Sequence, residues 1–193
     1  MDNQTKSRLL QDLIEYLDLQ DFLDTYPNYT ERMVYQLREE LTEALMQQTL
    51  AETAGEERTF SLYVDGASQP QKKQAGIGGV IFLEDSEIEN FSRNIGEATN
   101  NVSEYSALLY GLELLEKYEP EKVYIFADSE LVVKQLNGEY QVKNDNMQRL
   151  YGQVMNKLRQ IPHWTIEHIP RERNRRADQL SKQALLTGKT EGD

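Results

Sequence analysis

The chain has 193 residues, of which 38% are hydrophobic and 11 are tyrosine, and it contains no cysteine. This length accommodates one α/β domain with a small accessory element, and the hydrophobic content excludes global disorder. The lack of cysteine excludes disulfides, thiolate metal sites and cysteine nucleophiles, and it fits a reducing cytoplasm. The first ten residues have no apolar signal-peptide region, and no segment approaches membrane-spanning length. We therefore expect a cytoplasmic protein with no membrane association.

The formal net charge of −12 is unfavourable for a protein that binds nucleic acid. The charge is unevenly distributed, however. Residues 1–57 carry four Lys/Arg and 13 Asp/Glu, a net charge of −9, whereas residues 58–193 carry 17 and 20, a net charge of −3. The second segment also contains a cluster of arginines, namely Arg171, Arg173, Arg175 and Arg176. Because phosphate binding depends on the local field, the total charge does not exclude a nucleic-acid ligand.

The first 57 residues have the pattern of a helical hairpin. Apolar residues recur at helical spacing over 6–24, the segment 26–28 breaks that pattern, and a second helix is expected over 29–52. Residues 53–57 have the composition of a linker. Such a hairpin cannot bury both of its apolar stripes alone. We therefore expect it to pack on the main domain, on a second copy of the chain or on a protein partner.

From residue 58 the apolar pattern becomes alternating, which is typical of strands. The first predicted strand ends at Asp65-Gly66 and is followed by a loop over 69–74. Two further strands, over 75–84 and 87–97, complete an antiparallel meander.

The remaining elements alternate between helices and strands. They are a helix over 101–118, a strand over 123–128, helices over 129–136 and about 145–160, a strand over 163–169 and a helix over 174–187. The short apolar run at 123–128 is typical of a buried parallel strand. The order βββ-α-β-α-α-β-α predicts a mixed sheet with parallel strands in its centre and helices on both faces.

This order of elements brings four carboxylates to one end of the sheet: Asp65, Glu104, Asp128 and Asp178. Two of them end central strands, at the edge where open α/β sheets bind ligands, and two lie near the starts of helices that face the same edge. Crowded carboxylates repel one another, and divalent cations relieve that repulsion. The set therefore indicates metal-dependent phosphodiester chemistry.

Each of these four residues also has a local structural explanation. Asp65 suits an ordinary Asp-Gly turn, and Glu104 suits a capping box begun by Asn101. Asp128 suits an N-cap for the helix that follows it, and Asp178 suits an ion pair with the lysine four residues later. Taken singly, each residue is more often structural than catalytic. Taken together, the four favour a metal site.

Four segments, in order along the chain, resemble the ribonuclease H type 1 family. They are 60–66 (FSLYVDG), 99–111 (TNNVSEYSALLYG), 124–140 (YIFADSELVVKQLNGEY) and 168–185 (HIPRERNRRADQLSKQAL). The similarity is closest to the short form found in archaea and many bacteria, which lacks a basic helical protrusion. It implies an α/β, ribonuclease H-like domain over 58–193, built on a five-stranded mixed sheet flanked by helices and preceded by the α-helical hairpin and linker of residues 1–57.

The resemblance also implies an activity, which is hydrolysis of the RNA strand of an RNA–DNA hybrid to give 5′-phosphate and 3′-hydroxyl ends. Two Mg²⁺ ions, with Mn²⁺ as the alternative, would be bound by the four carboxylates. In this scheme Asp65 bridges both ions, Glu104 and Asp128 complete one site, and Asp178 completes the other. One ion would activate the attacking water and the other would stabilise the leaving oxygen.

Three further residues take roles from the same resemblance, and two lysines are candidate phosphate contacts. Asn100 and Asn101 match the pair that reads 2′-hydroxyls in the minor groove. Arg171 stands where the short branch carries an arginine and other members carry a mobile histidine that assists turnover. Lys72 and Lys73 lie in the loop after the first strand, which departs from the family's glycine-rich pattern. These lysines either contact phosphate or are simply solvated.

Two other classes of protein compete with the hybrid nuclease. A non-catalytic relative would keep the fold and bind nucleic acid or a protein through its N-terminal hairpin. The net charge and the altered first loop favour it, whereas the complete carboxylate set argues against it. Another metal nuclease, such as a proofreading exonuclease, would carry Asp-x-Glu on the first strand, where this chain has Ala67. A transposase would need DNA-binding modules for which the chain has little room.

Overall fold

A computed structural model describes residues 19–37, 40, 44 and 58–186, and the chain divides into two compact units, Met1–Glu57 and Arg58–Asp193. In the first unit, helix α2 spans Leu19–Thr25 and helical residues resume at 31–37 after a turn. The predicted break at 26–28 is therefore present. The beginning of the first predicted helix and the linker at 53–57 lie outside the described residues.

The second unit contains a five-stranded mixed sheet with the strand order β3-β2-β1-β4-β5. The strands are β1 (Thr59–Gln69), β2 (Gln74–Leu83), β3 (Ser86–Gly96), β4 (Lys122–Ala127) and β5 (His163–His168). β2 pairs antiparallel with both β1 and β3, whereas β4 pairs parallel with both β1 and β5. This arrangement confirms the predicted antiparallel meander and the predicted parallel centre.

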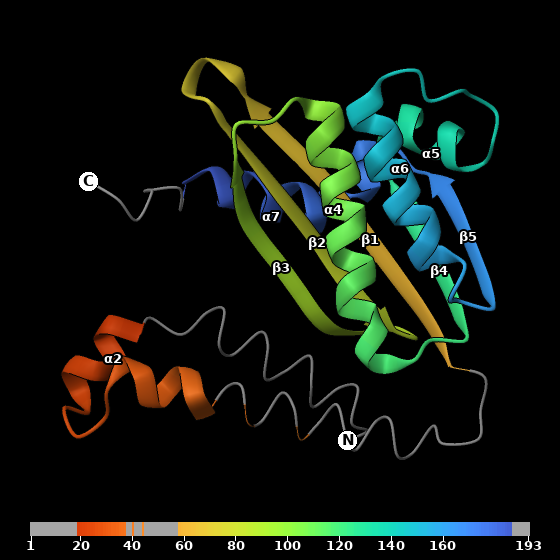
Figure 1. The fold of residues 1–193 in the computed structure, drawn as a ribbon. Coiled ribbons are helices and arrows are strands. Elements are labelled where there is room, and N and C mark those ends of the chain that lie inside the picture. The colour runs from red at the N-terminus through yellow and green to blue at the C-terminus, as the bar shows by residue number, and fades with distance from the viewer. Residues whose placement is uncertain (1–18, 38–39, 41–43, 45–57, 187–193) are drawn as a thin grey trace. The chain divides into compact units, whose positions relative to one another are not determined.

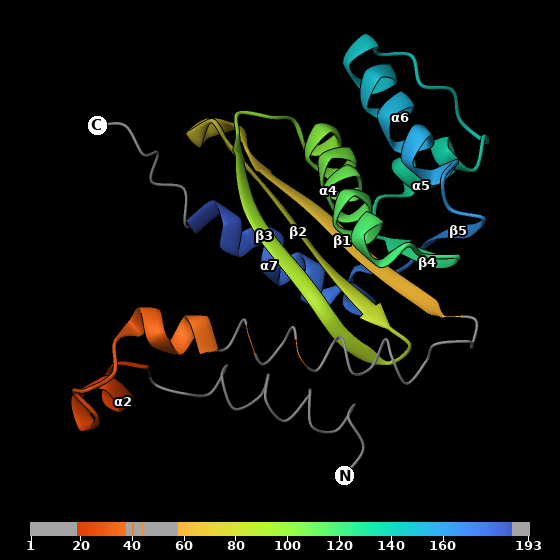
Figure 2. The same cartoon turned by 60° about the horizontal axis from the view of Figure 1, so that its bottom comes forward.

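Helices cover both faces of this sheet, as predicted (Figure 1). α4 (Asn100–Leu115) crosses one face and α7 (Arg175–Leu186) crosses the other, which the rotated view in Figure 2 also shows. α6 (Asp145–Leu158) packs on α4, and α5 (Glu130–Leu136) lies against β4 and β5. Among the described residues, no helix combines the length and the apolar character needed to cross a membrane.

The core forms where the apolar side of β1 meets α4. Phe60, Leu62 and Val64 alternate along the strand and are almost completely buried, as are Leu108 and Leu112 of the helix. The alternation of apolar residues on β1 and their helical spacing on α4 explain why these segments adopt the two structures. Burial of these side chains from water is the main force that fixes α4 across the sheet. Its first turn is thereby held beside β1.

β1 is longer than predicted, so the prediction that Asp65 ends the strand is wrong. The antiparallel pairing of β1 with β2 continues to Gln69↔Gln74, whereas its parallel pairing with β4 stops at Val64↔Ala127. The expected loop over 69–74 shrinks to the short 3-10 turn η1 (Pro70–Lys72). Asp65 still lies at the expected edge, because it is the first residue of β1 beyond the end of β4.

Gly66 allows β1 and α4 to approach each other closely. A Cβ atom at this position would lie 2.8 Å from Glu104 Cα and closer still to backbone atoms of Ser103 and Glu104. Backbone atoms in a packed helix cannot move aside cheaply, so only glycine fits here. The close approach also lets the Gly66 N–H donate a hydrogen bond to Glu104 Oε2 at 3.1 Å.

We therefore expect Gly66→Ala to destabilise the protein by about 3 kcal/mol, since the added methyl group overpacks the β1–α4 contact. Gly152→Ala is the matched control, because a Cβ at that position in α6 meets no described atom within 4 Å. The control should stabilise the protein by about 0.5–1 kcal/mol. Chemical denaturation of both variants measures the difference. Equal free energies of unfolding would show that the close approach is not needed.

Candidate metal centre

Three of the four predicted carboxylates meet at the end of β4. Asp65 comes from β1, Glu104 from the second turn of α4, and Asp128 from the residue after β4. One carboxylate oxygen from each lies within 4.8 Å of the others. Asp65 and Glu104 are only 3% and 6% exposed, and Asp128 is half-buried. These three residues, called the carboxylate trio below, converge in space from distant parts of the sequence.

The trio is not explained by helix capping. Thr99 caps α4, with its hydroxyl accepting a hydrogen bond from Val102 N at 3.4 Å, so the capping box of Asn101 with Glu104 is wrong. The N-cap of α5 is Ser129, so the N-cap role for Asp128 is wrong as well. Asp128 Oδ1 instead accepts a hydrogen bond from Asn174 Nδ2 at 3.2 Å. Neither Glu104 nor Asp128 is therefore used as a helix cap.

Asp178 is engaged by two cationic side chains. Lys182 Nζ lies 2.6 Å from its Oδ2, which is the predicted ion pair at four residues, and Arg171 Nε lies 2.8 Å from its Oδ1. Asp178 is connected to the trio through Ser181, whose hydroxyl donates to Asp65 Oδ2 and lies 3.0 Å from the Asp178 carbonyl oxygen. The fourth predicted ligand lies outside the trio, although its charge contributes to the raised pKa of Asp65, and it is neutralised by Arg171 and Lys182.

Burial dominates the electrostatics of the trio. Burial, with a smaller contribution from the charges of Asp65 and Asp128, raises the pKa of Glu104 to about 9. Burial likewise raises the pKa of Asp65 to about 7, although the hydrogen bond from Ser181 opposes this effect. Burial alone would also raise the pKa of Asp178, but the bonds from Lys182 and Arg171 outweigh it and lower that pKa. The trio thus lacks the positive charge that would let all its members ionise.

The donor set fits a hard divalent cation. All three members of the trio offer carboxylate oxygens, which are the ligands that Mg²⁺ and Mn²⁺ favour, and the chain contains no cysteine that would favour a softer ion. A divalent ion would stabilise the ionised forms that burial disfavours.

Comparison with known proteins gives the trio a family context. Residues 63–184 match the family described as reverse transcriptase-like. Ribonuclease HI of Halobacterium salinarum is 36% identical over 124 residues, which are 64% of this chain and 62% of that protein. The N-terminal RNase H domain of a Mycobacterium tuberculosis protein has a TM-score of 0.63 at 32% identity, and the match covers 66% of this chain and 98% of that one. The chain belongs to the ribonuclease H type 1 family.

Another structure similar to the ribonuclease H domain is LC11-RNase H1 in complex with an RNA/DNA hybrid. It is 35% identical with a TM-score of 0.61, over 65% of this chain and 96% of that one. The chain spans less than two thirds of the halobacterial protein, at 62%, and 34% of a bifunctional M. tuberculosis protein to which it is 35% identical. The family match begins at residue 63, so the N-terminal unit lies outside it.

The other predicted site residues of the ribonuclease H domain lie on the surface. Asn100 and Asn101 are exposed in the first turn of α4, and Lys72 and Lys73 are exposed at the turn between β1 and β2. Lys73 lies 3.9 Å from Glu97 in a loose ion pair. Their exposed positions suit contact with a ligand, and their roles stay predictions.

Two buried polar residues at the site were not predicted from the sequence. Ser181 is fully buried and donates to Asp65, and Asn174 is 1% exposed and donates to Asp128. Asn174, just before α7, and Ser181, within it, are at helical spacing with Ala177 and Ala184, which are fully buried. A polar residue on an apolar stripe is the signal by which these two residues could have been found.

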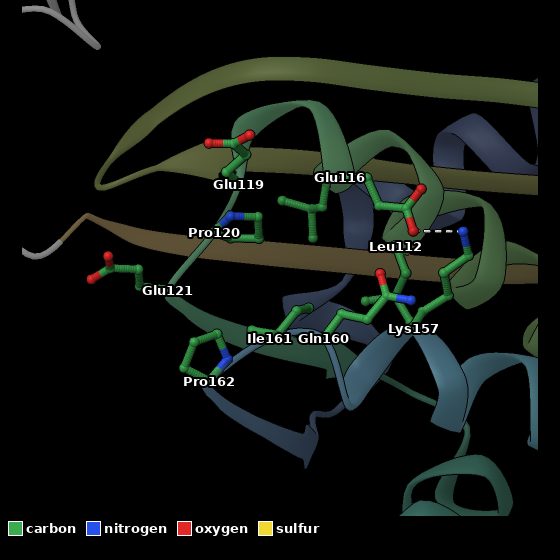
Figure 3. A pocket seen from close by; sticks show the side chains of 10 residues that line it. Leu112, Glu116, Glu119, Pro120, Glu121, Lys157, Gln160, Ile161 and Pro162 are labelled. Carbon is green, nitrogen blue, oxygen red and sulfur yellow. Dashed lines mark hydrogen bonds and ion pairs between the residues drawn. The ribbon is translucent and has the colours of Figure 1, made fainter.

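A cavity of about 440 Å³ lies away from the trio, at the other end of β4 (Figure 3). It is lined by the C-terminal ends of α4 and α6 and by the turn at Glu119, Pro120 and Glu121 that leads into β4. On its rim, Lys157 Nζ pairs with Glu116 Oε1 at 2.5 Å. The cavity contains none of the predicted site residues, so it is separate from the carboxylate trio.

Proposed function

We propose that the protein is a metal-dependent endonuclease that hydrolyses the RNA strand of RNA–DNA hybrids and leaves 5′-phosphate and 3′-hydroxyl ends. The observation that carries this proposal is the trio of Asp65, Glu104 and Asp128, whose oxygens lie within 4.8 Å of one another in a ribonuclease H domain. The similarity to LC11-RNase H1, which binds an RNA/DNA hybrid, supports the choice of substrate.

Two divalent ions, Mg²⁺ with Mn²⁺ as the alternative, would supply an activated water and stabilise the leaving oxygen. Asp65, Glu104 and Asp128 are the residues that would bind one ion, and Asp178 together with Asp65 would bind the other. Binding requires Glu104 and Asp65 to release protons, because burial raises the pKa of both carboxyl groups. Arg171 and Lys182, which now neutralise Asp178, place two positive charges where substrate phosphates would approach.

Substrate choice would depend on exposed residues around the trio. Asn100 and Asn101 stand four and three positions before Glu104 on α4, so their side chains would reach a minor groove laid over the trio. Reading of 2′-hydroxyls there would distinguish RNA from DNA. Lys72 and Lys73 would contribute phosphate contacts, because phosphate binding depends on the local field and the net charge of −3 of residues 58–193 does not exclude it.

The substrate proposal is tested with three duplexes of about 20 base pairs and one sequence, namely an RNA–DNA hybrid, a double-stranded RNA and a double-stranded DNA. Each strand is end-labelled in turn, and each duplex is incubated with protein and Mg²⁺ or Mn²⁺. We expect cleavage of the RNA strand of the hybrid alone. The products should be substrates for a ligase that requires a 5′-phosphate and a 3′-hydroxyl end. Cleavage of the DNA duplex at a comparable rate would contradict the proposal.

A further inference from the structure

Asn174 connects the ends of the two central strands. It precedes α7 and is 1% exposed. Its Nδ2 donates to the Val64 carbonyl oxygen at 2.8 Å and to Asp128 Oδ1 at 3.2 Å. Val64 directly precedes Asp65 and pairs with Ala127, which directly precedes Asp128. One amide group therefore lies where the pairing of β1 with β4 ends, next to both Asp65 and Asp128.

The orientation of this amide is fixed by its partners. A carbonyl oxygen and a carboxylate oxygen both accept hydrogen bonds, so the amino group must face them. The other atom, Asn174 Oδ1, is buried and has no hydrogen-bond partner among the described atoms. A buried acceptor without a partner costs about 1–3 kcal/mol. This cost argues against a role in stability alone, since an apolar side chain of the same size would avoid it.

We propose that Asn174 is a positioning residue of the metal centre, which fixes the Asp128 carboxylate relative to Asp65 so that the two present their oxygens to one cation. Asp128 is half-buried after the end of β4, where the Asn174 amide donates to its carboxylate, whereas Glu104 is held separately by Gly66 N. Hydrogen bonds to a metal-binding carboxylate orient it, and their loss typically weakens metal binding by about 10–100-fold.

This inference deepens the proposed function and rests on it for the identity of the bound ion. It is tested by a readout that needs neither nucleic acid nor cleavage, which is Mn²⁺ binding measured by isothermal titration calorimetry. The samples are the full-length wild type, Asn174→Ala and Asn174→Leu. Leucine has the same number and branching of side-chain heavy atoms as asparagine and lacks the unpaired oxygen, so this variant keeps the test valid if the alanine variant does not fold. Thermal melts of the same samples report on folding.

Asn137→Ala is the matched control, because the Asn137 amide also donates to a strand carbonyl, that of Ile166 at 3.4 Å, at the end of α5. We expect the dissociation constant for Mn²⁺ to rise about tenfold in both Asn174 variants and to stay unchanged in the control. Folded Asn174 variants that bind Mn²⁺ as tightly as the wild type would overturn the inference alone. A wild type that binds no Mn²⁺ would instead overturn the metal centre, and with it the proposed function.

Discussion

Asp65→Asn is expected to lower the rate of hybrid cleavage by at least about a thousand-fold, equivalent to about 4 kcal/mol of lost transition-state stabilisation. Asp65 is the carboxylate proposed to contact both ions, and an amide cannot supply its charge. The same change is expected to raise the melting temperature of the metal-free protein above neutral pH. Burial raises the pKa of Asp65 to about 7, so ionisation of this group opposes folding.

Asparagine matches aspartate in shape, and its oxygen can still accept the hydrogen bond from Ser181. The matched control is Asp85→Asn, in the exposed turn between β2 and β3, which should change neither quantity. Cleavage rates and melts in chelator measure both effects. An Asp65→Asn protein that retains a tenth or more of the wild-type rate, or that melts lower than the wild type in chelator, would contradict this account.

The metal-free protein is also expected to lose stability as the pH rises. The pKa of Asp65 rises on folding from 3.8 to about 7 and that of Glu104 rises from 4.5 to about 9, in both cases chiefly through burial. Between these values the folded state binds more protons than the unfolded state, so the free energy of unfolding falls with increasing pH. This contribution is complete below about pH 4 and is lost as the pH passes through about 7 and then about 9.

Divalent ions should reverse this trend, because they bind the ionised carboxylates and stabilise the folded state by mass action. Unfolding is measured at about pH 5, 7 and 9, in chelator and in excess Mg²⁺. In chelator, Glu104→Gln should remove most of the loss between pH 7 and 9. Glu113→Gln, an exposed substitution on the same helix, should leave it unchanged. A wild-type curve in chelator that rises from pH 5 to 9 would show that the trio ionises without a cation.

The sequence predicted the order of strands and helices because the apolar period changes sharply between elements. It failed at β1, because alternation cannot show that a strand keeps one neighbour after losing the other. The short turn at Pro70–Lys72 lets β1 continue along β2 after β4 has ended. The capping predictions failed for a related reason, since Thr99 and Asn101 are both favoured N-cap residues by type and only the backbone decides between them.

The candidate site was predictable where its signals are local or follow from strand ends. The ion pair of Asp178 with Lys182 follows from spacing along the helix, whereas its second partner, Arg171, lies in the turn before α7. Asn174 and Ser181 went unpredicted because their partners lie 46 and 116 residues away in the sequence. The predicted role of residues 1–57 in self-association or partner binding stays a prediction.

The most direct test of the central claim is cleavage of a strand-labelled RNA–DNA hybrid by the wild type and by Asp128→Asn, with and without Mg²⁺ or Mn²⁺. Asparagine at 128 can still accept the hydrogen bond from Asn174, so the variant should fold and differ chiefly in charge. The account predicts that the wild type cuts only the RNA strand, only with an ion present, and that the variant does not cut. Absence of cleavage by folded wild-type protein with either ion, or equal cleavage by the variant, would contradict it.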